Sequence, residues 1–146
     1  ILLDVRSIAM VGASTTWNRP SYFVMKYLKQ KGYRVIPVNP RSAGQELLGE
    51  TVCSGLDTLP EQVDMVDMFR PAGEATELVR QAIRLEVKVF WMQLELRNEE
   101  AASMAEEQGM KVVMNRCPKI EYSRLFGELG WNGINTGVIF NRRRRI

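Results

Sequence analysis

The residues best suited to chemistry lie in five short loops, each directly after an apolar run. These loops are 12–20 (GASTTWNRP), 39–41 (NPR), 69–73 (FRPAG), Gln93 and 115–118 (NRCP). Together they offer small residues, hydroxyls, amides, arginines and one thiol, a set suited to holding an anion. If the apolar runs are parallel strands, their carboxyl ends share one edge and bring the loops together. The sequence therefore predicts one crevice for an anionic ligand.

The first loop carries most of this prediction. Gly12 permits a tight turn, and a following helix would direct free N–H groups and its positive dipole end at the crevice. Ser14 and Thr15 add hydroxyl donors, while Arg19 adds a fixed charge suited to phosphate. The loop lacks the later glycines of the dinucleotide pattern G-x-G-x-x-G. We expect phosphate binding here without the full dinucleotide signature.

The end of the second apolar run also departs from the dinucleotide pattern. NAD sites place Asp or Glu about 20 residues beyond the first loop, where it holds the ribose hydroxyls. Here residues 38–41 read Val-Asn-Pro-Arg, with an arginine and no acid. Arg41 suits a phosphorylated ribose, as in NADP or the 3′-phosphorylated ADP of coenzyme A. The alternative interpretation is that Arg41 is a solvated loop residue.

Composition narrows the function classes. A chain of 146 residues with 45% hydrophobic and 25% charged residues fits one compact domain. The net charge is +3, and because Arg142–Arg145 carry four positive charges the rest is near neutral, so nucleic acid is not the expected partner. The chain has no His, which excludes a His base or a Ser-His-Asp triad. We expect a binding protein rather than an enzyme, with no metal site.

No apolar run reaches the roughly 20 residues that cross a bilayer, and the first residues lack a signal-peptide core. A cytoplasmic location is therefore expected, with no membrane contact.

Elements of two lengths alternate along the chain. Apolar runs predict strands at 7–12, 33–38, 63–69, 87–92 and 111–114, with 50–53 as a minor edge strand. Amphipathic stretches predict helices at 20–31, 73–85, 98–108 (capped by Asn98) and 118–129. Apolar strands joined by helices indicate a parallel sheet covered on both faces. The sequence therefore predicts a three-layer α/β fold, a Rossmann-like doubly wound parallel sheet of about five strands in a single domain.

Six motifs follow one another along the chain: 11–14 (VGAS), 18–21 (NRPS), 38–40 (VNP), 66–71 (VDMFRP), 91–93 (WMQ) and 115–119 (NRCPK). In this order they resemble the small single-domain coenzyme A-binding proteins, which are similar to the N-terminal domain of the succinyl-CoA synthetase alpha subunit. The resemblance covers about residues 7–140. It implies a short segment near 51–53 in place of the second crossover helix. Because the synthetases need a phosphorylated histidine, full ligase activity is not expected of this chain alone.

The resemblance also implies a coenzyme A site that draws on all five loops. The pyrophosphate would lie at the first loop and the adenosine with its 3′-phosphate along 39–41. Residues 69–71 would form the opposite wall, and the pantetheine arm would run toward Gln93 and 115–117. The implied site residues are Gly12, Ala13, Ser14, Asn18, Arg19, Asn39, Pro40, Arg41, Phe69, Arg70, Pro71, Gln93, Asn115 and Cys117.

Cys117 adds a chemical possibility. It precedes Pro118, which favours the first turn of a helix, and it is flanked by Arg116 and Lys119. A thiol at a helix N-terminus beside cations should have a lowered pKa, and coenzyme A ends in a thiol, so a mixed disulfide is chemically reasonable. The alternative is a small buried residue at a tight junction.

The leading interpretation is a non-catalytic carrier, sensor or protector of coenzyme A or an acyl-CoA. Two alternatives are an NADP-dependent reductase, with Arg41 on the 2′-phosphate, and a nucleotide-responsive regulatory protein. The Arg-rich tail 142–146 and the exposed edge strand would suit a homodimer.

Overall fold

The computed structural model describes residues 4–17, 19–93 and 96–116. The strands are β1 (Ser7–Val11), β2 (Arg34–Val38), β3 (Glu46–Leu47), β4 (Glu50–Thr51), β5 (Met65–Met68), β6 (Val89–Met92) and β7 (Lys111–Val113). The helices are α1 (Pro20–Gln30), α2 (Ala75–Arg84) and α3 (Glu99–Glu107), and 3-10 turns span Pro40–Ser42, Leu56–Thr58 and Ala72–Glu74. The predicted helix 118–129 lies outside the described residues. In the described ranges, no helix has both the length and the apolar character that a bilayer crossing requires.

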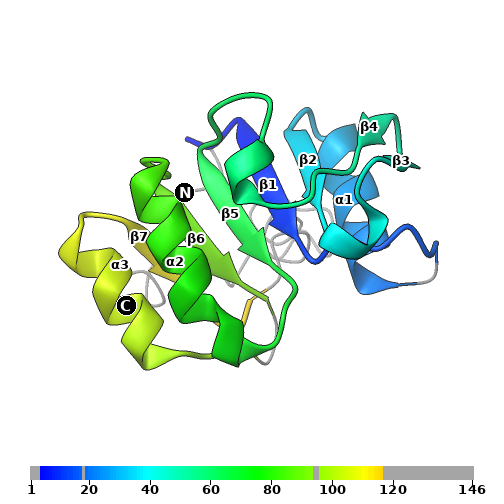
Figure 1. Ribbon diagram of the computed structural model, residues 1–146. Helices are drawn as coiled ribbons and strands as arrows, with labels where there is room; N and C mark the ends of the chain where they lie inside the picture. The colour runs from blue at the N-terminus through cyan, green and yellow to red at the C-terminus, as the bar shows by residue number, and fades with distance from the viewer. Residues whose placement is uncertain (1–3, 18, 94–95, 117–146) are drawn as a thin grey trace, which may run out of the picture.

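The main sheet has five parallel strands in the order β2-β1-β5-β6-β7. The chain moves outward from β1 to β2 and then returns to β5 on the other side of β1 (Figure 1). Strand order therefore reverses between β1 and β5. In sheets of this kind, ligands bind outside the carboxyl ends of the strands at this switch point.

Helices cover both faces of the sheet, and the side chains of each strand point alternately to one face and the other. On β1, Ala9 and Val11 belong to the core beneath α2 and α3, and Ile8 and Met10 to the core beneath α1. Figure 1 shows α2 and α3 together in front of the sheet, with α1 behind β2. All residues of β5 and β6 are buried, as expected for strands covered on both faces. The predicted three-layer Rossmann-like α/β fold is confirmed.

The connection from β2 to β5 contains no crossover helix. Instead, β3 and β4 pair as a two-residue antiparallel hairpin, and Cys53 then forms a single parallel bridge with Val38. Cys53 N–H donates to the carbonyl of Pro37 at 2.9 Å, and its own carbonyl accepts from Asn39 N–H at 2.8 Å. The edge-strand prediction for 50–53 was wrong in one respect, because β4 pairs with β3 and only Cys53 joins the main sheet.

Candidate functional site

A cavity of about 240 Å³ opens at the switch point of the sheet, on the face covered by α2. We call it the switch-point cavity. Its walls come from the ends of β1, β2 and β5, the loop after the hairpin, and α2. The lining residues are Val11, Gly12, Val38, Asn39, Pro40, Arg41, Ser54, Gly55, Leu56, Arg70, Glu74, Leu78 and Gln81.

The structure brings part of the sequence-predicted set into this cavity. The predicted residues that line it are Gly12, Asn39, Pro40, Arg41 and Arg70. Ala13, Ser14, Arg19, Phe69 and Pro71 lie in the same loops but do not line it, and Gln93 and Asn115 follow β6 and β7. Asn18 and Cys117 lie outside the described residues.

Eight lining residues were not predicted as site residues, and two of them, Val11 and Val38, are the last residues of β1 and β2. Ser54, Gly55 and Leu56 follow the hairpin, where no regular pattern marks them. Glu74, Leu78 and Gln81 belong to α2 or the turn before it, a stretch that the sequence predicted only as an amphipathic helix. Their spacing of four and three residues places them on one side of a helix, which is a signal that could have identified them.

Gly12 forms the closest approach between the first loop and the β5 loop. Its φ is +91°, a conformation that favours glycine, and a Cβ there would stand 3.0 Å from Arg70 Cδ and from the Phe69 carbonyl oxygen. The tight turn predicted at Gly12 is present, and both its positive φ and the close neighbours favour glycine at this position.

The expectation of free N–H groups in this loop was wrong for most of them. The N–H groups of Gly12 and Ala13 both donate to the Val38 carbonyl, at 2.8 and 3.3 Å. Ser14 N–H donates to the Ser21 hydroxyl at 3.0 Å. The reason is long-range: β2 runs beside β1, and its last carbonyl meets the start of the loop. A ligand at this loop must therefore rely mainly on side chains.

Asn39 connects the first two loops. Its side-chain nitrogen donates to the Ala13 carbonyl at 2.8 Å, and its side-chain oxygen accepts from Arg41 N–H at 3.0 Å. The second contact caps the 3-10 turn Pro40–Ser42. Asn39 thereby fixes the backbone that carries Arg41.

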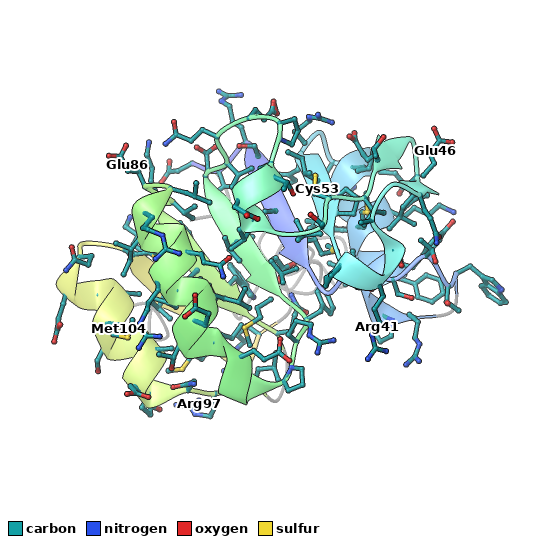
Figure 2. The ribbon with its side chains drawn as sticks, viewed as in Figure 1. Arg41, Glu46, Cys53, Glu86, Arg97 and Met104 are labelled. Carbon is teal, nitrogen blue, oxygen red and sulfur yellow. The ribbon has the colours of Figure 1, made fainter. Side chains whose placement is uncertain are left out.

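Arg41 is exposed at the rim of the switch-point cavity, below the sheet in Figure 2. Its guanidinium makes no hydrogen bond or ion pair with any described residue. The one acidic residue that lines the cavity, Glu74, is paired with Arg70. Among the described residues nothing neutralises Arg41, so its positive charge faces the rim of the cavity.

Arg70 and Glu74 form a two-point ion pair across another part of the rim. Arg70 Nε donates to Glu74 Oε1 at 3.0 Å, and Nη2 donates to Oε2 at 2.7 Å. The hydrogen bonds lower the pKa of Glu74 and raise that of Arg70. Both groups remain charged at neutral pH.

Asp67 and Gln93 form a buried pair deeper in the sheet. Asp67 is fully buried on β5, where Gln93 Nε2 donates to its Oδ1, while Oδ2 has no hydrogen-bond partner among the described residues. Burial raises the pKa of Asp67 to about 7. Gln93 lies at the predicted place after β6, but its amide nitrogen is occupied by this contact. No cluster of three or more metal-binding side chains was found in the part of the chain that the structure describes.

Known proteins are similar to this chain in sequence and in fold. Residues 6–123 match the CoA binding domain family. The uncharacterized protein YneT of Bacillus subtilis (strain 168) is 35% identical over 123 residues, covering 84% of this chain and 90% of that protein. The solved structure of cell-free ID.343 from Thermus thermophilus is 38% identical with a TM-score of 0.82, covering 86% of this chain and 93% of that chain.

One further relative is an enzyme of known reaction. The ADP-forming acetate–CoA ligase II of Archaeoglobus fulgidus is 28% identical over 85 residues, which is 57% of this chain and 12% of the ligase. The similarity therefore covers only a small part of that enzyme. Because the family match extends over most of the sequence, this protein belongs to the CoA binding domain family.

Proposed function

We propose that the switch-point cavity binds the 3′-phosphorylated adenosine end of coenzyme A. The observation that carries the proposal is Arg41, whose guanidinium stands at the cavity with no partner among the described residues. A carboxylate at the end of the second strand would hold ribose hydroxyls. An arginine there favours a ribose that carries a phosphate, as the ribose of coenzyme A does.

The remaining walls fit this assignment. Val38, Leu56 and Leu78 offer apolar surface to a purine ring, and Ser54 and Gln81 offer polar atoms beside it. The volume of about 240 Å³ is below the roughly 300–1,000 Å³ of sites that enclose a drug-sized ligand. The cavity therefore suits the adenosine end alone. We propose that the diphosphate lies by Gly12, Ser14 and Arg19, and that the pantetheine arm continues toward Gln93, Asn115 and Cys117.

A ligand panel tests the assignment. A ligand that binds only the folded state raises the melting temperature by mass action. Coenzyme A should raise it more than 3′-dephospho-coenzyme A, NADP(H) or ADP at equal concentration. A larger shift with NADP(H) would favour the reductase alternative, because Arg41 could also hold a 2′-phosphate. Equal shifts with ADP and coenzyme A would favour a general nucleotide-responsive protein.

The variant Arg41→Ala tests the residue itself. Losing a charge-assisted contact should cost about 1.5–3 kcal/mol of binding free energy, roughly a 10- to 150-fold weaker Kd for coenzyme A. Binding of 3′-dephospho-coenzyme A should change little, and titration calorimetry measures both. Arg6→Ala is the matched control, because Arg6 is exposed at the opposite end of β1. Equal losses for the two ligands would show that Arg41 does not contact the 3′-phosphate.

We propose that the protein carries, senses or protects coenzyme A or an acyl-CoA without catalysing a reaction, and that Cys117 exchanges with its thiol. The Cys117 thiolate would attack coenzyme A disulfide, form the Cys117–coenzyme A disulfide and release one coenzyme A thiolate. Intact-mass measurement should show this adduct in the wild type and in Cys53→Ser, but not in Cys117→Ser. Cys53 is a suitable control because burial raises the pKa of its thiol and so reduces its thiolate fraction. An adduct lost only in Cys53→Ser would contradict the assignment.

The proposal takes residues 1–146 as one coenzyme A-binding domain ending in the Arg-rich segment 142–146. A cytoplasmic location and a homodimer remain predictions from the sequence.

A further inference from the structure

The turn between β5 and α2 places Glu74 directly beside Arg70. Pro71 follows Arg70 and restricts the backbone, with φ at −52°. Glu74 N–H donates to the Pro71 carbonyl at 2.9 Å and closes the 3-10 turn. The turn thus returns the chain to Arg70, and both side chains line the switch-point cavity.

The Arg70 guanidinium is held along one edge by Glu74. Glu74 occupies the edge formed by Nε and Nη2, with contacts of 3.0 and 2.7 Å. The aliphatic part of the side chain passes close to Gly12, since Arg70 Cδ lies 3.0 Å from the point where a Cβ on Gly12 would stand. Nη1 has no hydrogen-bond partner among the described residues. The edge formed by Nη1 and Nη2 is therefore the one left for an anion.

A carboxylate at a site for an anionic ligand opposes binding through its charge. It also fixes the plane of an arginine that would otherwise lose much rotamer freedom when it binds. An arginine already held in one orientation pays less of this ordering cost, and its second edge keeps the geometry for a two-point phosphate contact.

We propose that Glu74 is a positioning residue, which orients Arg70 toward the diphosphate of coenzyme A. This inference rests on the proposed function and deepens it. Glu74 touches no ligand itself and acts through Arg70 alone. Arg70 would meet the ligand with its guanidinium already oriented by Glu74. Arg41, in contrast, is not held by any described partner.

A double-mutant cycle measured by titration calorimetry tests this inference. Glu74→Ala should weaken coenzyme A binding roughly three- to tenfold, the range expected for freeing one long side chain. In an Arg70→Ala background, the same change should not weaken binding further. Glu74→Gln, which keeps one acceptor oxygen, should give a smaller loss. Adenosine 3′-monophosphate lacks the diphosphate, so its affinity should be equal in the wild type and Glu74→Ala.

The matched control is Glu77→Ala on the same helix. Glu77 also pairs with an arginine, Arg80, at 3.1 Å, but it does not line the cavity. Its loss should leave coenzyme A affinity unchanged.

Three results would overturn the inference while leaving the proposed function intact: tighter coenzyme A binding by Glu74→Ala, unchanged binding, or equal losses with and without Arg70. The first would mean that Glu74 acts only as a competing charge. If the wild type binds no coenzyme A, the proposed function fails and this inference fails with it.

Discussion

Replacing Asp67 by asparagine should change how the stability of this protein depends on pH. Asp67 is fully buried between β1 and β6, and Gln93 provides its hydrogen bond through Oδ1. Within the part of the chain that the structure describes, Oδ2 has no hydrogen-bond partner. Asparagine keeps the shape of the side chain and the acceptor for Gln93, and it removes the ionisable proton. The variant therefore imitates the neutral form of Asp67 at every pH.

The sign and size of the effect follow from the pKa. Burial, opposed by the Gln93 hydrogen bond, raises the pKa of Asp67 from 3.8 to about 7. Between these values the folded protein keeps a proton that the unfolded chain releases, so this group's contribution to stability falls as the pH rises through that range. At about 1.4 kcal/mol per pH unit, the difference corresponds to about 4 kcal/mol. The full contribution is present below about pH 4 and is lost above about pH 7.

Urea unfolding between pH 4 and pH 8 measures this effect, with tryptophan fluorescence as the probe. The informative quantity is the unfolding free energy of Asp67→Asn minus that of the wild type, because groups common to both proteins cancel. The difference should be small near pH 4 and should rise in favour of the variant to about 4 kcal/mol near pH 8. The dependence on urea should keep the same slope in both proteins.

A difference that stays flat from pH 4 to pH 8 would refute the reasoning, because it would mean that water or another group solvates the carboxylate. A difference that falls with pH would refute it more strongly. That result would require a cation beside Asp67 that stabilises its charged form.

Two further substitutions test individual backbone positions. Gly12→Ala should lower the unfolding free energy by about 1–3 kcal/mol through its positive φ, and further through the 3.0 Å approach to Arg70 Cδ. Gly109→Ala measures the backbone effect alone, because Gly109 has a φ of +83° and open space around it. Equal urea midpoints for the two variants would contradict the contact argument. Asn98→Ala should lower the unfolding free energy by about 1 kcal/mol, because Asn98 Oδ1 accepts from Ala101 N–H at 2.9 Å at the start of α3. In the same urea assay, Asn98→Ser should keep most of this stability, since serine also caps helices. An equal loss in both variants would exclude capping as the cause.

The main elements of the fold could be predicted because their signals are local. β6 is buried on both faces and therefore appears as a continuous apolar run, β5 does so apart from Asp67, and Asn98 caps α3 as expected. The sequence indicated a strand at 50–53, but the pairing of β4 with β3 in a hairpin could not be predicted, because two residues per strand give no periodicity. Its position depends on distant side chains: Lys29 Nζ donates to the Leu48 carbonyl at 2.7 Å, and Glu50 pairs with both Lys29 and Arg34.

The candidate site was predictable to the extent that it follows from strand ends. Arg41 and Arg70 were expected because parallel strands bring the loops after them to one edge. The contribution of α2 was missed: the spacing of Glu74, Leu78 and Gln81 marks one side of a helix, but whether that side meets a cavity depends on how the helix crosses the sheet. The occupied N–H groups of the first loop were missed for a similar reason. The Val38 carbonyl that accepts those of Gly12 and Ala13 is remote in sequence and adjacent only in the sheet.

The missing crossover helix and the cavity have one structural cause. In a doubly wound sheet, a helix after β2 would lie beside α2 on the same face of the sheet and cover that face near β2. Here the chain crosses as a hairpin and short 3-10 turns, and from this connection Leu56 and Val63 are buried in the core below α2 while Cys53 and Leu59 pack against it. Ser54 and Gly55 are left as one wall of the switch-point cavity, joined to the main sheet by the bridge of Cys53 to Val38 and to the following turn by hydrogen bonds with Thr58. Because this wall joins the main sheet through one bridge, ligand affinity should respond to changes in the hairpin before global stability does.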